Sequence, residues 1–439
     1  MSEVLDHGAA EGWGSTVQFA PGHEGFAYRP DEVIVGGEQG RDTAQRMFGA
    51  VFESEAEPIF PEVDERVSQG AAQLYRLRGA PDPIMAVEAL RTEGLIAQPN
   101  HVMFAHGEGC CCGPHPAQHW QGCLMGQPMY ASPMYASPMY ASPVYASPMY
   151  ASDLQATGRR RSSAVPTVAP PLPRTLGQAG ARGVSIAVLD TGMAGDGFRP
   201  AALDAFAPAQ AHWEQPDADG DRYLDPAAGH GTFIAGLIEL VTPGCEITVE
   251  KVLSSYGEGD EVAVARRVHA LAGVVDLINL SFGGYAMERM HVLAAAVRRA
   301  GALGTVVVAS AGNDGTCRPT FPAALPGVVG VGAIGPHGPA PFSNYGPWVR
   351  ACAPGVDVVS WFFADFDGPE AAAPGGVDPD RFQSWAKWSG TSFSGPIVVA
   401  ALAREMAAWS VDAAEAVRRV VDAPGLLKLP DLGTAVNIS

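Results

Sequence analysis

The second half of the chain alternates short apolar runs with segments of helical pattern, and this alternation constrains the fold more than any other feature. The apolar runs are Val184–Leu189, Glu246–Leu253, Val274–Ser281, Thr305–Ser310 and Val328–Ala333. Apolar runs of this length are typical of parallel strands, because crossover helices bury both faces of a parallel sheet. We therefore expect residues 174–439 to form an α/β domain, with a parallel sheet and helices on both faces.

Polar residues stand where four of the apolar segments end or begin. Asp190 follows the first apolar run directly, and Asn313 follows a later one. His230 lies between two glycines at the start of an apolar segment, and Ser392 lies among small residues before the alanine-rich run Ile397–Trp409. Because the carboxyl ends of parallel strands meet at one edge of the sheet, where α/β proteins place their sites, we expect these residues to come together.

These residue types suit nucleophilic catalysis. A serine hydroxyl is a weak nucleophile at neutral pH, so it needs a general base, a group that orients the base and a donor for the developing oxyanion. We predict Ser392, His230, Asp190 and Asn313 in these four roles. Taken singly, a capping serine, a loop histidine or a structural aspartate would be an ordinary alternative.

The segments around these residues resemble the signature blocks of subtilisin-like serine proteases, in the same order. Over roughly residues 165–425 the matching segments are Val184–Gly192, Gly229–Gly236, Asp276–Gly284, Val306–Asn313, Phe342–Gly346, Ala353–Gly355 and Ser389–Pro396. The resemblance implies a serine endopeptidase, a hydrolase of polypeptides. It also implies that a strand made of Ser281, Phe282, Gly283 and Gly284 binds an extended substrate by adding a strand to the sheet.

The same resemblance implies the role of each residue. His230 would take the proton of Ser392 as the serine attacks a peptide carbonyl, and Asp190 would hold the imidazole tautomer. The Asn313 amide and the backbone N–H of Ser392 would bind the oxyanion. The chain departs from the family at Phe393–Ile397, where the family has Met-Ala-Ser-Pro-His, and in the long run Trp361–Trp388, which we expect to be a loop that restricts or recognises substrate.

A smaller domain is expected before the protease-like part. Residues 1–29 are Gly-rich and polar and suggest a loose tail, whereas residues 30–106 have a β, α, β, α, β pattern, typical of a ferredoxin-like α+β domain of the split βαβ kind. The expected elements are Arg29–Val35, Asp42–Phe52, Leu74–Leu77, Pro83–Thr92 and Ile96–Phe104.

The segment Ala97–Val102 resembles the end of the propeptides that precede many subtilisin-like domains. The resemblance implies a zymogen in which this domain inhibits the protease in cis by laying a strand in the cleft. An unrelated α+β domain that packs nearby is the alternative.

Residues 107–173 form a linker of unusual composition. Five near-identical units with the pattern Pro-Met-Tyr-Ala-Ser run from Pro128 to Ser152. Proline at every fifth position forbids a continuous helix, so this tandem repeat is expected to be an extended spacer or an array presented to a partner. Two alternative functions stay open for the whole chain. One is a maturation protease dedicated to one precursor peptide, which the acidic surface and the long run before Ser392 would fit; the other is a catalytically silent scaffold that displays the Tyr repeat.

Two clusters are candidate metal sites, although the predicted activity requires no cofactor. The linker holds the candidate zinc ligands Cys110, Cys111, Cys112, His115, His119 and Cys123. Three adjacent cysteines cannot all reach one tetrahedral centre, so a thiol-rich loop is the alternative. The candidate calcium ligands are Asp217, Asp219, Asp221 and Asp225, for which a solvated acidic loop is the alternative.

Charge, hydropathy and cysteine usage limit which partners, which cellular compartment and which disulfides the chain can have. The formal charge is −19, which argues against nucleic acid as a partner because no basic patch is available to meet phosphates. Neither a secretory signal nor a membrane-spanning stretch is visible, so we expect a cytoplasmic protein, with export by an uncommon route as the alternative. The cysteines do not suggest a disulfide framework, and we expect Cys245, Cys317 and Cys352 to be buried packing residues.

Overall fold

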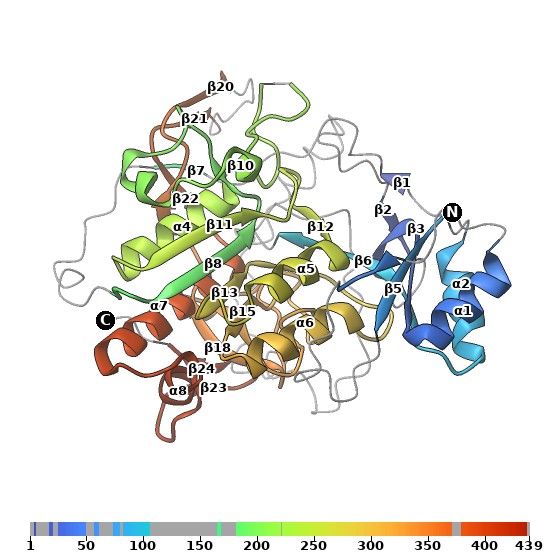
Figure 1. Cartoon of the computed structure of the whole chain (residues 1–439). Coiled ribbons are helices and arrows are strands. Elements are labelled where there is room, and N and C mark those ends of the chain that lie inside the picture. Colours follow the sequence, from blue (N-terminus) through green and yellow to red (C-terminus); the bar gives the residue numbers. More distant parts are fainter. Residues whose placement is uncertain are drawn as a thin grey trace, which may run out of the picture.

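The computed structural model describes residues 4–5, 17–20, 25–49, 57–60, 73–79, 82–105, 165–167, 181–220, 222–370 and 379–436. Within these residues an N-terminal domain packs against one side of a larger α/β domain (Figure 1). The predicted zinc ligands and the tandem repeat lie outside the described residues.

The larger domain is built on a mostly parallel sheet, as predicted. Its strand order is β11-β8-β13-β15-β16-β18-β24-β23, with β17 beside β16. The strands are β8 (Ser185–Asp190), β11 (Glu246–Lys251), β13 (Leu277–Leu280), β15 (Val306–Ser310), β16 (Val328–Gly335), β17 (Gly338–Pro339), β18 (Val349–Pro354), β23 (Lys428–Leu429) and β24 (Gly433–Ala435). The five apolar runs of the sequence supply β8, β11, β13, β15 and β16, so the α/β prediction is confirmed.

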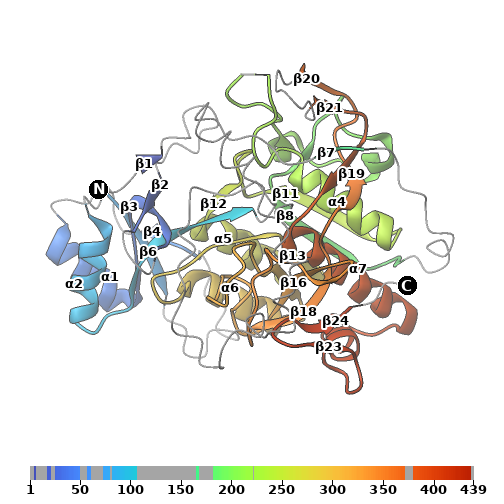
Figure 2. The same cartoon turned by 180° about the vertical axis from the view of Figure 1, so that it is seen from behind.

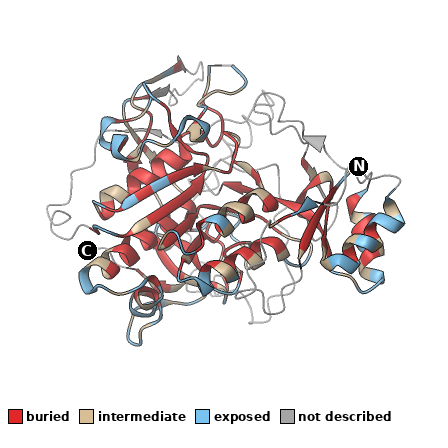
Figure 3. Cartoon of the chain, viewed as in Figure 1, coloured by how far each residue is buried: buried red, intermediate tan, exposed pale blue. Residues whose placement is uncertain are grey.

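Helices cover both faces of this sheet. They are α4 (His230–Val241), α5 (Glu261–Leu271), α6 (His291–Ala302), α7 (Thr391–Trp409) and α8 (Ala413–Val417). Helices α5 and α6 pack together on one face, and α4 and α7 pack together on the other (Figures 1 and 2). The first thirteen residues of α7 are all buried, which explains why the run Ile397–Ala403 is continuously apolar. Figure 3 shows how thoroughly the central strands are buried.

The N-terminal domain has the ferredoxin-like arrangement. Along the chain run β3 (Ala27–Gly36), α1 (Gly37–Phe48), β4 (Glu57–Pro58), β5 (Leu74–Arg78), α2 (Pro83–Thr92) and β6 (Ala97–Ala105). The antiparallel sheet has the order β6-β3-β5-β4. Helix α2 begins where the Asp82 side chain accepts a hydrogen bond from the Met85 N–H, with proline in the first turn. A core of its own, which includes Val33, Leu77 and Leu90, holds the domain together.

Two element boundaries of this domain differ from the prediction. Strand β3 begins at Ala27 and pairs with β2 (Val17–Phe19), which in turn pairs with β1 (Val4–Leu5), so part of the expected tail belongs to the sheet. Helix α1 begins at Gly37 rather than Asp42. Both errors have one cause: Gly-rich segments have weak intrinsic preferences, and tertiary pairing decides their structure.

The long run before Ser392, expected to be a loop, contains strands instead. Strands β19 (Val358–Trp361) and β22 (Trp385–Trp388) are antiparallel, and β20 (Phe366–Glu370) and β21 (Pro379–Phe382) form a second pair between them. Strand β7 (Val165–Pro166), from the predicted linker, pairs with β22. The Pro and Gly residues of the run Trp361–Trp388 argued against strands, yet strands form there because segments within this insertion pair with one another.

Of the three cysteines expected to be packing residues, two behave as predicted. Cys245 and Cys352 are free and buried. Cys317 is disulfide-bonded, so the prediction was wrong for this residue. The order of residues along a chain does not reveal which thiols the fold brings together. None of the described helices is long and apolar enough to cross a membrane.

Candidate active site

Asp190 and His230 form a buried pair at the carboxyl edge of the sheet. Asp190 ends β8 and His230 begins α4, and Asp190 Oδ1 lies 2.7 Å from His230 Nδ1. The Thr191 N–H donates to the same carboxylate oxygen at 2.8 Å. This arrangement fixes the tautomer in which Nδ1 carries the hydrogen and donates a hydrogen bond to Asp190. His230 Nε2, the atom that a general base would use, has no hydrogen-bond partner among the described residues.

The residue before His230 has to be glycine. Gly229 has φ of +81°, in the left-handed region that favours glycine, and a Cβ built there would lie 2.1 Å from the Phe362 ring. Aromatic rings also surround the imidazole. The rings of Trp388 and Phe393 each have their centroid 5.5 Å from that of His230. Phe393 stands where the family has methionine, so the departure noted in the sequence contributes to this apolar surrounding.

Ser392 is the second residue of α7, opposite the end of β13. Its hydroxyl donates to the Ser281 carbonyl at 2.7 Å, and the Ser281 hydroxyl donates to the Ser392 carbonyl at 2.8 Å. The serine hydroxyl is therefore bonded to the predicted substrate strand rather than to His230, which sequence alone did not foresee. The three predicted triad residues are nevertheless gathered at one edge of the sheet.

Asn313 is held by its side-chain oxygen. Asn313 Oδ1 accepts hydrogen bonds from Thr391 N at 3.0 Å and from Thr391 Oγ1 at 2.9 Å. Because Oδ1 is bound on this side, the amide plane is fixed and its NH₂ group faces away from Thr391. The Asn313 amide thus lies beside the first turn of α7, the turn that carries the backbone N–H of Ser392.

Sequence reasoning missed Glu214. This residue lies in β10 (Trp213–Glu214), which pairs in parallel with β9 (Met193–Ala194). Its carboxyl group accepts hydrogen bonds from the hydroxyls of Thr191 and Thr232 and, at 3.3 Å, from the Gly231 N–H. Burial raises the pKa of Glu214 to about 7, and the neighbouring Asp190 charge adds to the rise, while the two threonine hydrogen bonds and His230 lower the pKa. A single glutamate in a polar stretch carried no sequence signal.

The acidic loop brings three of the four predicted calcium ligands together. Oxygens of Asp217, Asp219 and Asp225 all lie within 4.8 Å of one another, while Asp221 lies outside the described residues. The Asp217 carboxylate accepts from two backbone N–H groups of its own loop, and Asp225 accepts from the Ser255 hydroxyl and the Ala218 N–H. Burial raises the pKa of Asp225 to about 6. The donor set suits calcium, and calcium binding stays a prediction.

The predicted substrate strand is paired with the N-terminal domain. Strand β14 (Phe282–Gly283) runs antiparallel to β6, with Phe282 opposite Ala105 and Gly283 opposite Phe104. On its other edge β6 pairs with β12 (Glu258–Asp260). The β6 strand thus lies between two strands of the α/β domain. At the end of the predicted segment, a Cβ on Gly284 would lie 2.8 Å from the carbonyl oxygen of Val102, so glycine permits this approach.

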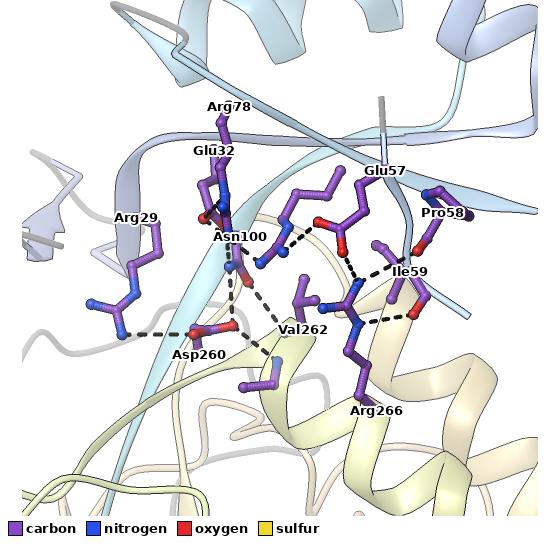
Figure 4. A network of polar contacts seen from close by, with 12 residues as sticks. Arg29, Glu32, Glu57, Pro58, Ile59, Arg78, Asn100, Asp260, Val262 and Arg266 are labelled. Carbon is purple, nitrogen blue, oxygen red and sulfur yellow. Dashed lines mark hydrogen bonds and ion pairs between the residues drawn. The ribbon is translucent and has the colours of Figure 1, made fainter. Parts of the chain in front are cut away.

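A polar network, buried at Asn100 and partly exposed at Arg266, joins the two domains beside β6 (Figure 4). Asn100 of β6 donates to Asp260 at 3.1 Å and accepts from the Val262 N–H at 3.3 Å, at the start of α5. Arg29 lies 3.7 Å from the same aspartate. Further along α5, Arg266 donates to the Ile59 carbonyl at 3.0 Å and forms an ion pair with Glu57.

A second buried group, Glu261 at the start of α5, contacts both β6 and the first turn of α6. Glu261 accepts from Gln98 Nε2 at 2.7 Å and from His101 Nδ1 at 2.8 Å, both on β6. Its other oxygen accepts from the N–H groups of Val292 and Leu293. His101 Nε2 accepts from the Met287 N–H of the α/β domain, so the other ring nitrogen, Nδ1, is the one that donates to Glu261. These contacts fix the position of β6 relative to both helices.

Comparison with known proteins identifies the α/β domain. The family model described as "Subtilase family" matches residues 181–421. A thermostable alkaline protease of Halalkalibacterium halodurans is 31% identical over 44% of this chain and 54% of its own length. An intracellular serine protease of Paenibacillus polymyxa is 31% identical over 53% of this chain and 69% of its own length.

The structural comparison reaches beyond that domain. Fervidolysin of Fervidobacterium pennivorans, a keratinolytic enzyme related to subtilisin, has a TM-score of 0.57 at 18% identity and covers 94% of this chain and 60% of its own. At that identity the likeness concerns the fold alone. The chain spans about half the length of the first curated relatives that it matches. The match over residues 181–421 covers more than half of the chain, which is therefore a member of the subtilase family.

Proposed function

We propose that this chain is a serine endopeptidase whose own N-terminal domain inhibits it in cis. The observation that carries the proposal is the position of β6, which lies antiparallel between β12 and β14, where an extended polypeptide substrate would have to pair. In this proposal Asp190, His230 and Ser392 form the catalytic triad, and β6 occupies the cleft that a peptide substrate would enter.

The proposed chemistry uses the side chains at the sheet edge. The Ser392 side chain would first turn from the Ser281 carbonyl toward His230 Nε2, which has no other partner among the described residues. His230 would then accept the hydroxyl proton as Ser392 attacks the peptide carbonyl, with Asp190 stabilising the imidazolium. His230 would next protonate the leaving amine as the C–N bond breaks. A water molecule, deprotonated by His230, would then attack the acyl-enzyme, and His230 would return the proton to Ser392 Oγ as the ester bond breaks.

The developing oxyanion would lie between two donors. The backbone N–H of Ser392 is one, at the positive end of the α7 dipole. The Asn313 NH₂ group is the other, because Thr391 already occupies its Oδ1. Fixed donors of this kind stabilise charge that forms in the transition state and cost no reorganisation during the reaction.

The register of β6 supports its role as a substrate-like strand. Ala105 lies opposite Phe282, so a peptide that continues this ladder places its next residue opposite Ser281. The Ser281 carbonyl is the acceptor of the Ser392 hydroxyl. A bound polypeptide would thus meet the nucleophile one residue beyond the position of Ala105.

Inhibition follows from the same geometry. With β6 in place, Asp190, His230 and Ser392 are each 0% exposed. Both strands that could pair with a substrate are already paired with β6, and buried contacts through Asn100 and Glu261 hold it there. Because the linker keeps inhibitor and cleft in one chain, their effective concentration is roughly millimolar for a flexible connection.

Of the alternatives, a silent scaffold does not account for a hydrogen-bonded Asp190–His230 pair beside Ser392. A maturation protease dedicated to one precursor would use the same chemistry on one substrate. The paired strands β20 and β21 of the insertion then become candidates for recognition of that precursor.

The test compares intact protein with protein nicked by trypsin in the linker at Arg159–Arg161. Intact protein is expected to hydrolyse a peptide substrate slowly at any dilution. The specific rate of nicked protein should rise on dilution, because the N-terminal fragment then dissociates. In nicked Asn100→Ala protein, the specific rate should begin to rise at a roughly 10-fold to 100-fold higher protein concentration, because the buried hydrogen bond between Asn100 and the charged Asp260 is lost.

Arg41→Ala is the matched control, because Arg41 lies on α1 and pairs there with Asp42. It should leave the dilution curve unchanged. Rates that are equal for intact and nicked protein at every dilution would show that the N-terminal domain is not an inhibitor. If neither form hydrolysed any peptide, the endopeptidase proposal itself would fail.

A further inference from the structure

Behind the Asp190–His230 pair lies a buried glutamate that the proposed peptidase chemistry does not use. Glu214 is 6% exposed and belongs to the two-residue strand β10, which pairs with β9 through Trp213–Met193 and Glu214–Ala194. Isolated buried carboxylates are costly, so a carboxylate at this depth requires dedicated partners.

The partners of Glu214 are the residues that follow the two members of the pair. Thr191, next to Asp190, donates its hydroxyl to Glu214 Oε1. Gly231, next to His230, donates its N–H to the same oxygen at 3.3 Å, and the Thr232 hydroxyl donates to Oε2. The Thr191 oxygen also accepts from the Gly231 N–H at 3.0 Å. One carboxyl group therefore connects the turn after β8 with the first turn of α4.

Two charged groups dominate the surroundings of Glu214 among the described residues. Asp190 on β8 raises the pKa of Glu214, and His230 on α4 lowers it. Strand β9, its pairing partner, contributes Met193 and Ala194, which carry no charge. Just before β10, the ring of His212 accepts from the Lys251 N–H through Nδ1. The charge of Glu214 is thus felt mainly by the Asp190–His230 pair.

We propose that Glu214 is a positioning residue that locks Asp190 and His230 together and whose negative charge raises the proton affinity of His230. The proposal rests on the proposed function only in naming His230 as the general base. The hydroxyls of Thr191 and Thr232 and the Gly231 N–H donate to the carboxyl group, and the two threonine hydrogen bonds oppose the rise in the Glu214 pKa that burial causes. An ionised carboxylate here stabilises the imidazolium over the neutral ring, as Asp190 does from the other side.

The first test needs no activity. In full-length protein carrying Ser392→Ala, the His230 imidazole is titrated by NMR with ¹⁵N-labelled histidine, and its resonance is assigned by comparison with His230→Gln. Adding Glu214→Gln should lower the His230 pKa by about one unit, because a nearby negative charge is removed. Glu250→Gln is the matched control: Glu250 is also buried, but it pairs with Arg267. This control should leave the His230 titration unchanged.

A second pair of variants serves if Glu214→Gln does not fold. Thr232→Val removes a donor to Glu214, which makes the carboxyl group easier to protonate and so lowers the His230 pKa by a smaller amount. Thr232→Ser keeps the hydroxyl and should restore the parent titration. A His230 pKa that is the same in the parent, Glu214→Gln and Thr232→Val proteins would overturn the proposal.

Activity gives an independent readout in protein nicked and diluted as above. In Glu214→Gln the acidic limb of kcat/KM should move to lower pH with KM nearly unchanged, since the base is then neutral at lower pH. A purely structural role would instead lower kcat without moving the limb. If Glu214→Gln shifted the His230 titration but the parent hydrolysed no peptide, the endopeptidase proposal would fail and the role of Glu214 would stand. If the parent were active but Glu214→Gln left the His230 titration unchanged, the role of Glu214 would fail and the endopeptidase proposal would stand.

Discussion

The Ser392→Ala protein, nicked and diluted to release the N-terminal domain, is expected to hydrolyse peptides about 10⁶-fold more slowly than the parent, the order of the loss in the related subtilisin. The hydroxyl is the proposed nucleophile, and its single acceptor is the Ser281 carbonyl. Its loss removes this hydrogen bond, which costs roughly 1 kcal/mol of stability, so the fold should persist. The measurement is kcat on a chromogenic peptide, with thermal unfolding as the check of the fold.

Ser394→Ala is the matched control for this variant. Ser394 is a buried serine of the same helix, and its hydroxyl donates to the Ala353 carbonyl at 3.0 Å. We expect turnover within a few-fold of the parent. If Ser392→Ala retained turnover comparable with that of Ser394→Ala, another nucleophile would have to carry the reaction.

Asn313→Ala should lower kcat by about 10²-fold to 10³-fold and leave KM nearly unchanged. Thr391 holds the amide oxygen of Asn313, so the NH₂ group is fixed before substrate arrives. A donor that acts on the oxyanion stabilises the transition state and not the ground state, which predicts this division between kcat and KM. Steady-state kinetics on the nicked, diluted protein measure both constants.

Thr391→Val tests how much the orientation of the Asn313 side-chain amide contributes to kcat, because the amide itself is still present. This variant keeps the Asn313 NH₂ group and removes one of the two hydrogen bonds to Oδ1, so the loss in kcat should be smaller. An Asn313→Ala protein that raised KM at constant kcat would place Asn313 in substrate binding instead of the oxyanion hole.

Much of the α/β domain could be predicted from the sequence, because its signals are local. Each parallel strand is an apolar run, and Asp190 and Asn313 follow such runs directly, so the topology of a parallel sheet brings them to one edge. His230 and Ser392 lie at helix starts, which flanking glycines and small residues mark. Strand β6 was recognisable as a short extended segment at the end of an α+β pattern.

The features that escaped prediction depend on contacts between distant segments. Glu214 is 24 residues from Asp190 and 16 from His230 in number, and only the pairing of β10 with β9 brings its carboxyl group behind them. Strand β2 and the strands of the Trp361–Trp388 insertion exist through pairing rather than through residue preference. The Ser392 side chain is bonded to Ser281. The orientation of a single hydroxyl has no sequence signal.

The most direct test of the central claim is the labelling of Ser392 by a fluorophosphonate probe, read by mass spectrometry of the labelled peptide. We predict slow labelling of intact protein, rapid labelling after nicking and dilution, and no labelling of Ser392→Ala in either state. The label should lie on Ser392, because a phosphonate requires the activated hydroxyl and the same oxyanion donors as a peptide. Equal labelling rates in the intact and released forms, or no labelling of Ser392 after release, would contradict a serine endopeptidase whose cleft β6 blocks.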